Sequence, residues 1–243
     1  MTMPALAVAG LQKSFGPVQV LHDITLDIHA GKRHLVLGAN GAGKTTFFNM
    51  LTGQLAPSAG RIMFYGEDIT ALSVERRARL GLGRTFQIAS VFGDLTVRQN
   101  LALAMTAPCV ATEARKESPD SIVEAISRAG LASHGDRPAK HLSYGQQRRL
   151  EVEMAFVSKP RMLLLDEPMA GLTRDERHDL AARIVDLGRT TGILLIEHDM
   201  EVALAIAERL TVLHLGRVLA DGSVEEVLSN RQVQDIYLGR GHG

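Results

Sequence analysis

Two stretches of the chain are apolar at nearly every position, which is the pattern of strands buried on both faces. They are "RMLLLDEP" (161–168) and "GILLIEHD" (192–199), and each precedes a segment that we expect to be helical. In residues 174–188 the apolar side chains Leu180, Ile184 and Leu187 recur at helical spacing. Doubly buried strands that alternate with helices are typical of a parallel sheet covered by helices on both sides.

Other segments alternate apolar and polar residues and predict strands with one buried face. These are residues 24–28, residues 61–65 and a hairpin over 210–222 that turns near Gly216. A short apolar strand at 33–38 ends in glycine and leads into a helix over 44–51, and "SVEE" from Ser223 predicts a capping box for a last helix. We therefore expect an antiparallel β subdomain beside the parallel sheet.

The middle of the chain has helical spacing and no strong strand. Residues 95–105 place Val97, Leu101 and Met105 on one face, and residues 118–130 begin with a Ser-Pro helix start. We predict one α/β domain over residues 1–243, with a helical subdomain over roughly 88–157 inserted into it.

Composition excludes several classes of protein. The 27 basic and 27 acidic residues balance, which gives no support to nucleic-acid binding. The single cysteine, Cys109, rules out a disulfide framework within the chain and fits a cytosolic setting. The start "MTMPALAVAG" lacks the basic region of a signal peptide, and the longest apolar run, Val202 to Ala207, is far shorter than the ~20 residues of a membrane span.

The strand at 33–38 leads into a glycine-rich loop that matches the phosphate-loop pattern G-x-x-x-x-G-K-[ST]. Glycines let the backbone wrap closely around phosphate oxygens, Lys44 adds a charge for the terminal phosphates, and the Thr45 hydroxyl can bind Mg²⁺. The predicted nucleotide-binding residues are Gly38, Ala39, Asn40, Gly41, Ala42, Gly43, Lys44, Thr45 and Thr46.

Carboxylates end the first of the two buried strands. Asp166 and Glu167 follow "MLLL" directly, and the carboxyl edge of an open parallel sheet is where ligands bind. Asp166 can hold Mg²⁺ through water, and Glu167 can act on the attacking water as a general base. His198 ends the next strand and would reach the same edge, while Gln87 in "RTFQ" could reach the metal or the water.

Two further features suggest nucleotide contacts. Phe15, one of ten aromatic residues, could stack on an adenine ring, although a place in the core or in a turn is equally compatible with its position. Residues 141–149, "HLSYGQQRR", open a helix and so predict a second anion site, because the amino end of a helix attracts negative charge. The simplest geometry places this second site against a nucleotide that is held by another chain.

In this order the motifs resemble the ATP-binding-cassette (ABC) ATPases, over essentially the whole chain. The resemblance implies Walker A at 38–46, the Q-loop at Gln87, Walker B at Asp166 and Glu167, the switch histidine at His198 and the adenine-stacking aromatic at Phe15. It also implies that the signature loop acts on the nucleotide of a second subunit, through Ser143, Tyr144, Gly145 and Gln146. The cofactors implied are ATP and Mg²⁺, the latter bound by Thr45, Gln87 and Asp166.

Two positions depart from the family pattern. Tyr144-Gly145 replaces the usual double glycine of the signature, and Thr173 replaces the aspartate that usually ends the D-loop. Threonine cannot make the same ionic contacts between subunits, so the departure puts communication between the two sites in question. "YGQQRRLE", "GRTFQ", "EHDM" and the tail "YLG" resemble the branch that imports branched-chain and other hydrophobic amino acids, and that also includes urea and short-amide uptake systems.

This resemblance implies a peripheral ATPase on the cytoplasmic face of the inner (plasma) membrane. Its partners would be a second, identical or paralogous ATPase subunit, two membrane-spanning permeases and, indirectly, a periplasmic binding protein. A permease helix would dock along residues 87–100, where Val91 and Phe92 suit a groove if they are exposed and not part of the core. Export of lipid or lipopolysaccharide stays open as an alternative, and so does a cassette acting on DNA or ribosomes, which the chain's neutral charge disfavours.

Overall fold

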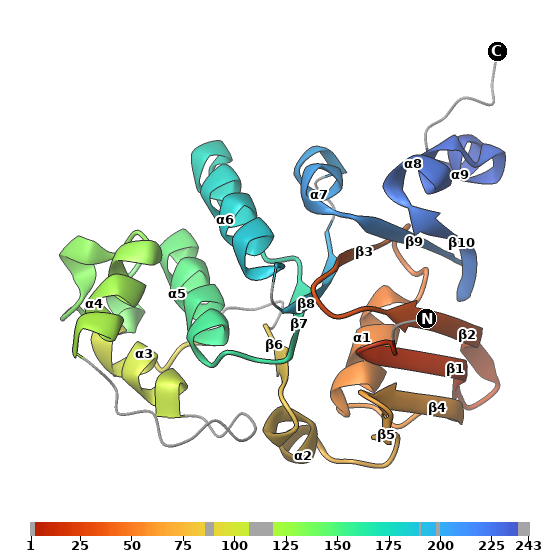
Figure 1. Ribbon diagram of the computed structural model, residues 1–243, viewed down its shortest axis with the longest axis horizontal. Helices are drawn as coiled ribbons and strands as arrows, with labels where there is room; N and C mark the ends of the chain where they lie inside the picture. The colour runs from red at the N-terminus through yellow and green to blue at the C-terminus, as the bar shows by residue number, and fades with distance from the viewer. Residues whose placement is uncertain (1–2, 86–89, 107–118, 190, 198–199, 238–243) are drawn as a thin grey trace.

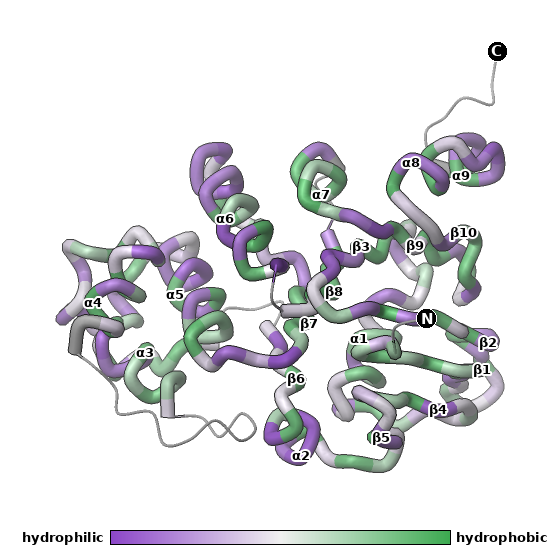
Figure 2. The backbone as a smooth tube through the Cα atoms, in the orientation of Figure 1, coloured by the Kyte–Doolittle hydropathy of each residue, from purple (hydrophilic) through white to green (hydrophobic). Residues whose placement is uncertain are grey.

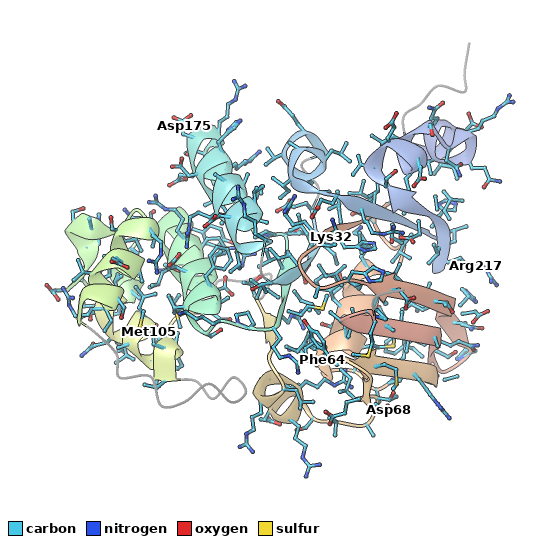
Figure 3. The ribbon with its side chains drawn as sticks, viewed as in Figure 1. Lys32, Phe64, Asp68, Met105, Asp175 and Arg217 are labelled. Carbon is cyan, nitrogen blue, oxygen red and sulfur yellow. The ribbon has the colours of Figure 1, made fainter. Side chains whose placement is uncertain are left out.

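The computed structural model describes residues 3–85, 90–106, 119–189, 191–197 and 200–237. A helical layer of α3, α4 and α5 lies at one end of the molecule and an antiparallel sheet at the other, with a parallel sheet between them (Figure 1). Figure 3 labels Met105, near the end of α3 in the helical layer, and Phe64, at the end of β4 in the antiparallel sheet. The predicted α/β class with an antiparallel subdomain is confirmed.

The central sheet has the strand order β10-β9-β3-β8-β7-β6, in which β9, β3, β8, β7 and β6 are parallel and β10 is antiparallel to β9. The strands are β3 (Arg33–Gly38), β6 (Leu82–Arg84), β7 (Met162–Asp166), β8 (Gly192–Ile196), β9 (Arg209–His214) and β10 (Arg217–Ser223). Every residue of β7 and β8 is buried, as their apolar sequences predicted.

Alternate residues of β7 belong to different cores. Met162 and Leu164 pack with α1 and the antiparallel sheet, whereas Leu163 and Leu165 pack with α5, α6 and the C-terminal helices. This is the period-two geometry of a strand that is covered on both faces. In Figure 2 the first turns of α6 are hydrophilic, as expected of a helix that covers the sheet with one face only.

The antiparallel sheet has the order β2-β1-β4-β5. Its strands are β1 (Leu6–Phe15), β2 (Val18–Ile28), β4 (Ala59–Phe64) and β5 (Glu67–Asp68). Helix α1 (Lys44–Thr52) fills the space between the two sheets, because Phe47, Phe48, Met50 and Leu51 are all fully buried there. The helix that begins at the phosphate loop is therefore held on both sides.

The helical layer has a core of its own, formed by α3, α4, α5 and the short turns before α5, and centred on Val97, Leu101, Ile126 and Leu150. We keep residues 88–157 as the proposed bounds of this subdomain. Besides α1, the described residues contain the helices α2 (Val74–Arg79), α3 (Val97–Thr106), α4 (Pro119–Arg128), α5 (Tyr144–Val157), α6 (Arg174–Leu187), α7 (Met200–Ile206), α8 (Val224–Ser229) and α9 (Arg231–Tyr237), with 3-10 turns at Ala132–His134 and Ala139–His141.

Two local predictions are confirmed and one is only half right. The hairpin turns at Leu215 and Gly216, both in the left-handed region, and Ser223 forms the predicted capping box with Glu226. Phe92 is exposed as the docking groove requires, but Val91 is only partly exposed, because it packs against the core of the helical layer.

Candidate functional site

The phosphate loop joins the buried strand β3 to helix α1, and two of its glycines are enforced by sterics. A Cβ at Gly38 would lie 2.6 Å from the carbonyl oxygen of Leu213, and a Cβ at Gly43 would lie 2.5 Å from Leu21 Cδ2. Gly43 also has a φ of 99°, in the left-handed region that favours glycine. No acidic residue occupies the first turn of α1, so the amino end of this helix faces the loop with its favourable dipole for an anion.

Lys44 folds back over the loop. Its Nζ donates to the carbonyl oxygens of Gly38 at 2.6 Å and Ala39 at 3.1 Å, and the residue is 7% exposed. Burial lowers the pKa of Lys44, while the nearby carboxylates of Glu167 and Asp166 act in the opposite direction. The structure therefore brings together the lysine and the two acids that the sequence assigned to one site.

Asp166 lies at the end of β7 and is 2% exposed. Arg84, at the end of the neighbouring strand β6, places its Nη2 3.6 Å from Asp166 Oδ2. The Arg84 Nη1 also donates to Asn49 Oδ1 and Thr52 Oγ1 of α1, both at 3.0 Å. Arg84 thus ties the acid to the helix that begins at the phosphate loop. Burial lowers the pKa of this guanidinium, and Asp166 opposes that shift.

Glu167 has a φ of 48°, which is uncommon for a residue with a side chain. Its N–H donates to the carbonyl oxygen of Ile196 at the end of β8 (2.9 Å), and its carbonyl accepts from Ala170 N at 3.2 Å. The backbone is therefore held on two sides while it turns sharply away from β7. This turn places the carboxylate close enough to Lys44 to act against the lowering of the lysine's pKa by burial.

Helix α5 begins at the second predicted anion site. Ser143 is its N-cap and forms a capping box with Gln146: the Gln146 N–H donates to Ser143 Oγ (3.3 Å), and the Ser143 N–H donates to Gln146 Oε1 (2.9 Å). The Gly145 N–H is outside this box, one residue before Gln146. The ring of Tyr144 is half exposed and lies over Gly171, where an added Cβ would be 2.6 Å from Tyr144 Cε1.

The donor set fits Mg²⁺. The hydroxyl of Thr45, exposed in the first turn of α1, and the carboxylate of Asp166 offer oxygen ligands, which this ion prefers. Within the described ranges no cluster of three or more His, Cys, Asp or Glu residues is suited to a metal. One carboxylate and one hydroxyl match the way in which Mg²⁺ completes its shell with water and substrate phosphates.

Three comparisons bear on this site. The family model described as "ABC transporter" matches residues 21–170, and the one described as "Branched-chain amino acid ATP-binding cassette transporter" matches residues 217–243. The chain belongs to the ABC transporter family. It is 37% identical to "High-affinity branched-chain amino acid transport ATP-binding protein LivG" of Escherichia coli (strain K12), covering 98% of this chain and 99% of the relative. The protein BraF of Pseudomonas aeruginosa, which carries the same description, has the same identity and coverage.

Solved structures agree with this assignment. A nucleotide-free ATP-binding cassette from an ABC transporter matches with a TM-score of 0.83 at 28% identity, covering 97% of this chain and 99% of that chain. The ADP conformation of an ATP-binding cassette also has a TM-score of 0.83 at 28% identity, covering 98% and 100%. The chain therefore has the fold of an ABC ATPase, and its family is one that binds ATP. Among the residues described, no helix is long and apolar enough to cross a membrane.

The predicted site residues have different outcomes. Gln87 and His198 lie outside the described residues. Phe15, at the end of β1, is 49% exposed and has Lys13 Nζ 5.1 Å from its ring centroid, so it is not a core residue and its ring is accessible. The Thr173 hydroxyl caps α6 in a box with Glu176, which gives this departure from the family pattern a structural role.

Sequence reasoning missed two arginines, Arg84 and Arg148. Arg84 lies inside "GRTFQ", where the prediction concerns the glutamine alone. Arg148, which no prediction singles out, is fully buried. The signal that was available is its place on the same helical face as the apolar core positions of α5.

Proposed function

We propose that this cassette hydrolyses MgATP to drive the import of branched-chain amino acids through a membrane transporter. One observation carries the ATPase chemistry: Lys44 of the phosphate loop, Asp166 and Glu167 lie at one sheet edge and interact electrostatically. The names of the relatives LivG and BraF, and the family match at the C-terminal end, support the cargo class.

Within one subunit, the loop amides and Lys44 bind the phosphates, and Phe15 stacks on the adenine ring. Thr45, Asp166 and Gln87 would hold Mg²⁺, which supplies charge neutralisation at the phosphate oxygens. Glu167 orients and deprotonates the attacking water, with His198 beside the terminal phosphate. Ser143 and the Gly145 N–H contact the γ-phosphate of a nucleotide that is bound by a second cassette subunit.

The first test concerns Glu167. Glu167→Gln should bind ATP normally and hydrolyse it at least ~10²-fold more slowly, the usual scale for a general base. Asp166→Asn should instead weaken both ATP binding and its Mg²⁺ dependence. Unchanged turnover in Glu167→Gln would remove Glu167 from the proposed role.

The second test concerns the shared site. In the Glu167→Gln background, ATP should convert monomers to dimers, as measured by light scattering. Adding Ser143→Arg should abolish that conversion and leave ATP binding intact. Ser133→Arg, which changes another exposed serine of the helical layer, is the matched control and should leave dimerisation unaffected. Dimerisation that survives Ser143→Arg would exclude the signature loop from the interface.

The proposed docking surface for the permeases lies between β6 and α3. Phe92 is 54% exposed, and its backbone is held by the buried Asn100, whose side chain accepts from Phe92 N (2.9 Å) and donates to Phe92 O (3.0 Å). A fixed and exposed aromatic side chain is typical of an anchor in a protein interface. The partners we propose are two permeases and, through them, a periplasmic binding protein, which would place the cassette at the cytoplasmic face of the membrane.

A second candidate function is the export of lipopolysaccharide, since the chain is 34% identical to "Lipopolysaccharide export system ATP-binding protein LptB" of Haemophilus influenzae, with 98% coverage of both chains. Reconstitution with the permeases encoded beside the gene separates the candidates. ATP-dependent uptake of radiolabelled leucine that requires a periplasmic binding protein supports import. Uptake of urea or a short amide, or extraction of lipopolysaccharide, in place of leucine uptake would overturn the cargo assignment.

A further inference from the structure

Arg148 is a fully buried arginine in the second turn of α5. Burying a guanidinium is costly unless its charge and its N–H groups are satisfied. Its charge is met by the Glu151 carboxylate, whose Oε2 lies 2.6 Å from Arg148 Nη1. Three further bonds of this guanidinium leave the helix and reach the Walker B segment.

Three consecutive carbonyl oxygens accept hydrogen bonds from Arg148. Its Nη2 donates to Asp166 O at 2.7 Å and to Glu167 O at 2.8 Å, and its Nε donates to Pro168 O at 3.2 Å. Three successive carbonyls can converge on one group only where the chain turns sharply. The left-handed backbone of Glu167 provides this turn.

The left-handed conformation is unfavourable for a residue with a side chain, so it persists only where its surroundings impose it. Arg148 donates to the carbonyl oxygen of Glu167, and the Glu167 N–H donates to the carbonyl oxygen of Ile196. The backbone of Glu167 is therefore held at both its N–H and its carbonyl group. The planar fork of a guanidinium can bind several acceptors in fixed directions, which the single ammonium of a lysine cannot do. The direction of the Glu167 carboxylate therefore depends on the arginine.

The same helix begins at the signature loop. Ser143 precedes Arg148 by five residues, about 7.5 Å along the helix axis. Further contacts join the two segments: Tyr144 lies over Gly171, and Arg149 Nη2 lies 3.5 Å from Glu176 Oε1. The start of α5 is thus connected to the segment from Asp166 to Glu176 at its beginning, its middle and its end.

We propose that Arg148 is a positioning residue for ATP hydrolysis, and that it fixes the Glu167 carboxylate relative to the signature helix. A displacement of the signature loop on contact with the second subunit's nucleotide is then transmitted through Arg148 to the catalytic turn of the same chain. This inference rests on the proposed role of Glu167 as the general base.

The test needs a control for the general cost of disturbing a buried arginine, and Arg77 provides one. It is 2% exposed and also donates to main-chain carbonyls, among them those of Met50, Leu51 and Leu72. These carbonyls lie at the far end of α1 and in the loop before α2, away from the Walker B turn. Arg148→Lys and Arg77→Lys therefore make the same chemical change at two buried arginines that both bind main-chain carbonyls, and Arg148 in addition pairs with Glu151.

In single-turnover ATP hydrolysis we expect Arg148→Lys to lower the rate constant by between ~10- and ~10²-fold, the scale of a small misplacement of a catalytic group. Its affinity for ATP should stay within ~3-fold of the wild type, because the phosphate loop is unchanged. Arg77→Lys should lower the thermal unfolding temperature with a rate constant within about twofold of the wild type. Equal rate losses in the two variants would overturn the proposal.

A double-mutant cycle with Glu167→Gln separates this proposal from the one it rests on. If Arg148 acts through Glu167, adding Arg148→Lys to Glu167→Gln should slow hydrolysis by less than ~3-fold further. Multiplied losses would overturn the positioning role and leave Glu167 as the base. A wild-type rate in Glu167→Gln alone would instead refute the base assignment. Should Arg148→Lys fail to fold, Arg148→Gln with Glu151→Gln removes both buried charges together, and the same rate loss is expected.

Discussion

The contact between Tyr144 and Gly171 gives a prediction whose magnitude follows from the structure. Gly171→Ala should destabilise the fold for two separate reasons. Its φ of 74° is unfavourable for alanine by roughly 1–2 kcal/mol. The new Cβ would also lie 2.6 and 2.7 Å from two ring atoms of Tyr144, and overpacking of this kind costs about 1–3 kcal/mol.

Two further variants separate these terms. Gly16→Ala places alanine at a φ of 58° where an added Cβ meets nothing within 4 Å, so it reports the backbone cost alone. Tyr144→Ala removes the ring, and in that background Gly171→Ala should lose its steric cost. We expect a coupling free energy of ~1–3 kcal/mol between the two substitutions.

Urea unfolding followed by circular dichroism measures each free energy, provided that the m-value is unchanged among the variants. Gly171→Ala should be clearly less stable than Gly16→Ala, and this excess should disappear when Tyr144 is also replaced. If Gly171→Ala costs no more than Gly16→Ala, or costs the same with and without the Tyr144 ring, then the ring does not rest on the D-loop in solution and the packing argument is wrong.

Four further substitutions test other parts of the molecule. Phe15→Ala should weaken ATP binding by ~1–3 kcal/mol, measured by calorimetry. The wild type should discriminate poorly between ATP and GTP, because stacking does not read the edge of the base. Strong selectivity for ATP would contradict the stacking role. Burial raises the pKa of Asp221, but hydrogen bonds, led by the one with His34, outweigh burial and lower the pKa to about 2. The wild type should therefore be more stable than Asp221→Asn above about pH 4, and this advantage should be lost as the pH falls through about 2. A difference in the free energy of unfolding that does not change with pH would argue against this. Phe92→Asp should uncouple hydrolysis from the permeases in proteoliposomes with little change in the fold, whereas Val91→Asp should lower the unfolding temperature because Val91 packs against the helical core.

The parts of the fold that sequence alone could predict are those whose signal is local. The phosphate loop and the strands β7 and β8 each carry their pattern within a few consecutive residues. Strand β1 was missed because "LAVAGLQKSF" has no clean alternation and contains Gly10 at a φ of 61°, beside a shift in the strand register. A bulged strand loses the period of two by which strands are recognised.

The contacts of Arg148 could not be predicted for a different reason. The carbonyl groups that it binds lie 18 to 20 residues later in the chain, at a turn whose shape sequence does not reveal. A charged residue on a helix is normally solvated, so the residue type alone does not indicate burial. Its burial depends on tertiary contacts with backbone groups, which leave no trace in the identity of the residues that supply them.

The threonine at the end of the D-loop gains meaning from these contacts. Thr173 accepts from the Glu176 N–H (3.4 Å), and the Glu176 carboxylate accepts from Thr173 N (2.9 Å), which is the N-cap arrangement that an aspartate could also provide. Loss of the charge therefore leaves the start of α6 capped. The same Glu176 carboxylate faces Arg149 and lies 3.4 Å from where a Cβ of Gly145 would be. The cap of α6 and the start of α5 thus share one carboxylate. Within the chain this carboxylate and the Tyr144 ring hold the D-loop to the signature helix, without any contribution from an aspartate at position 173.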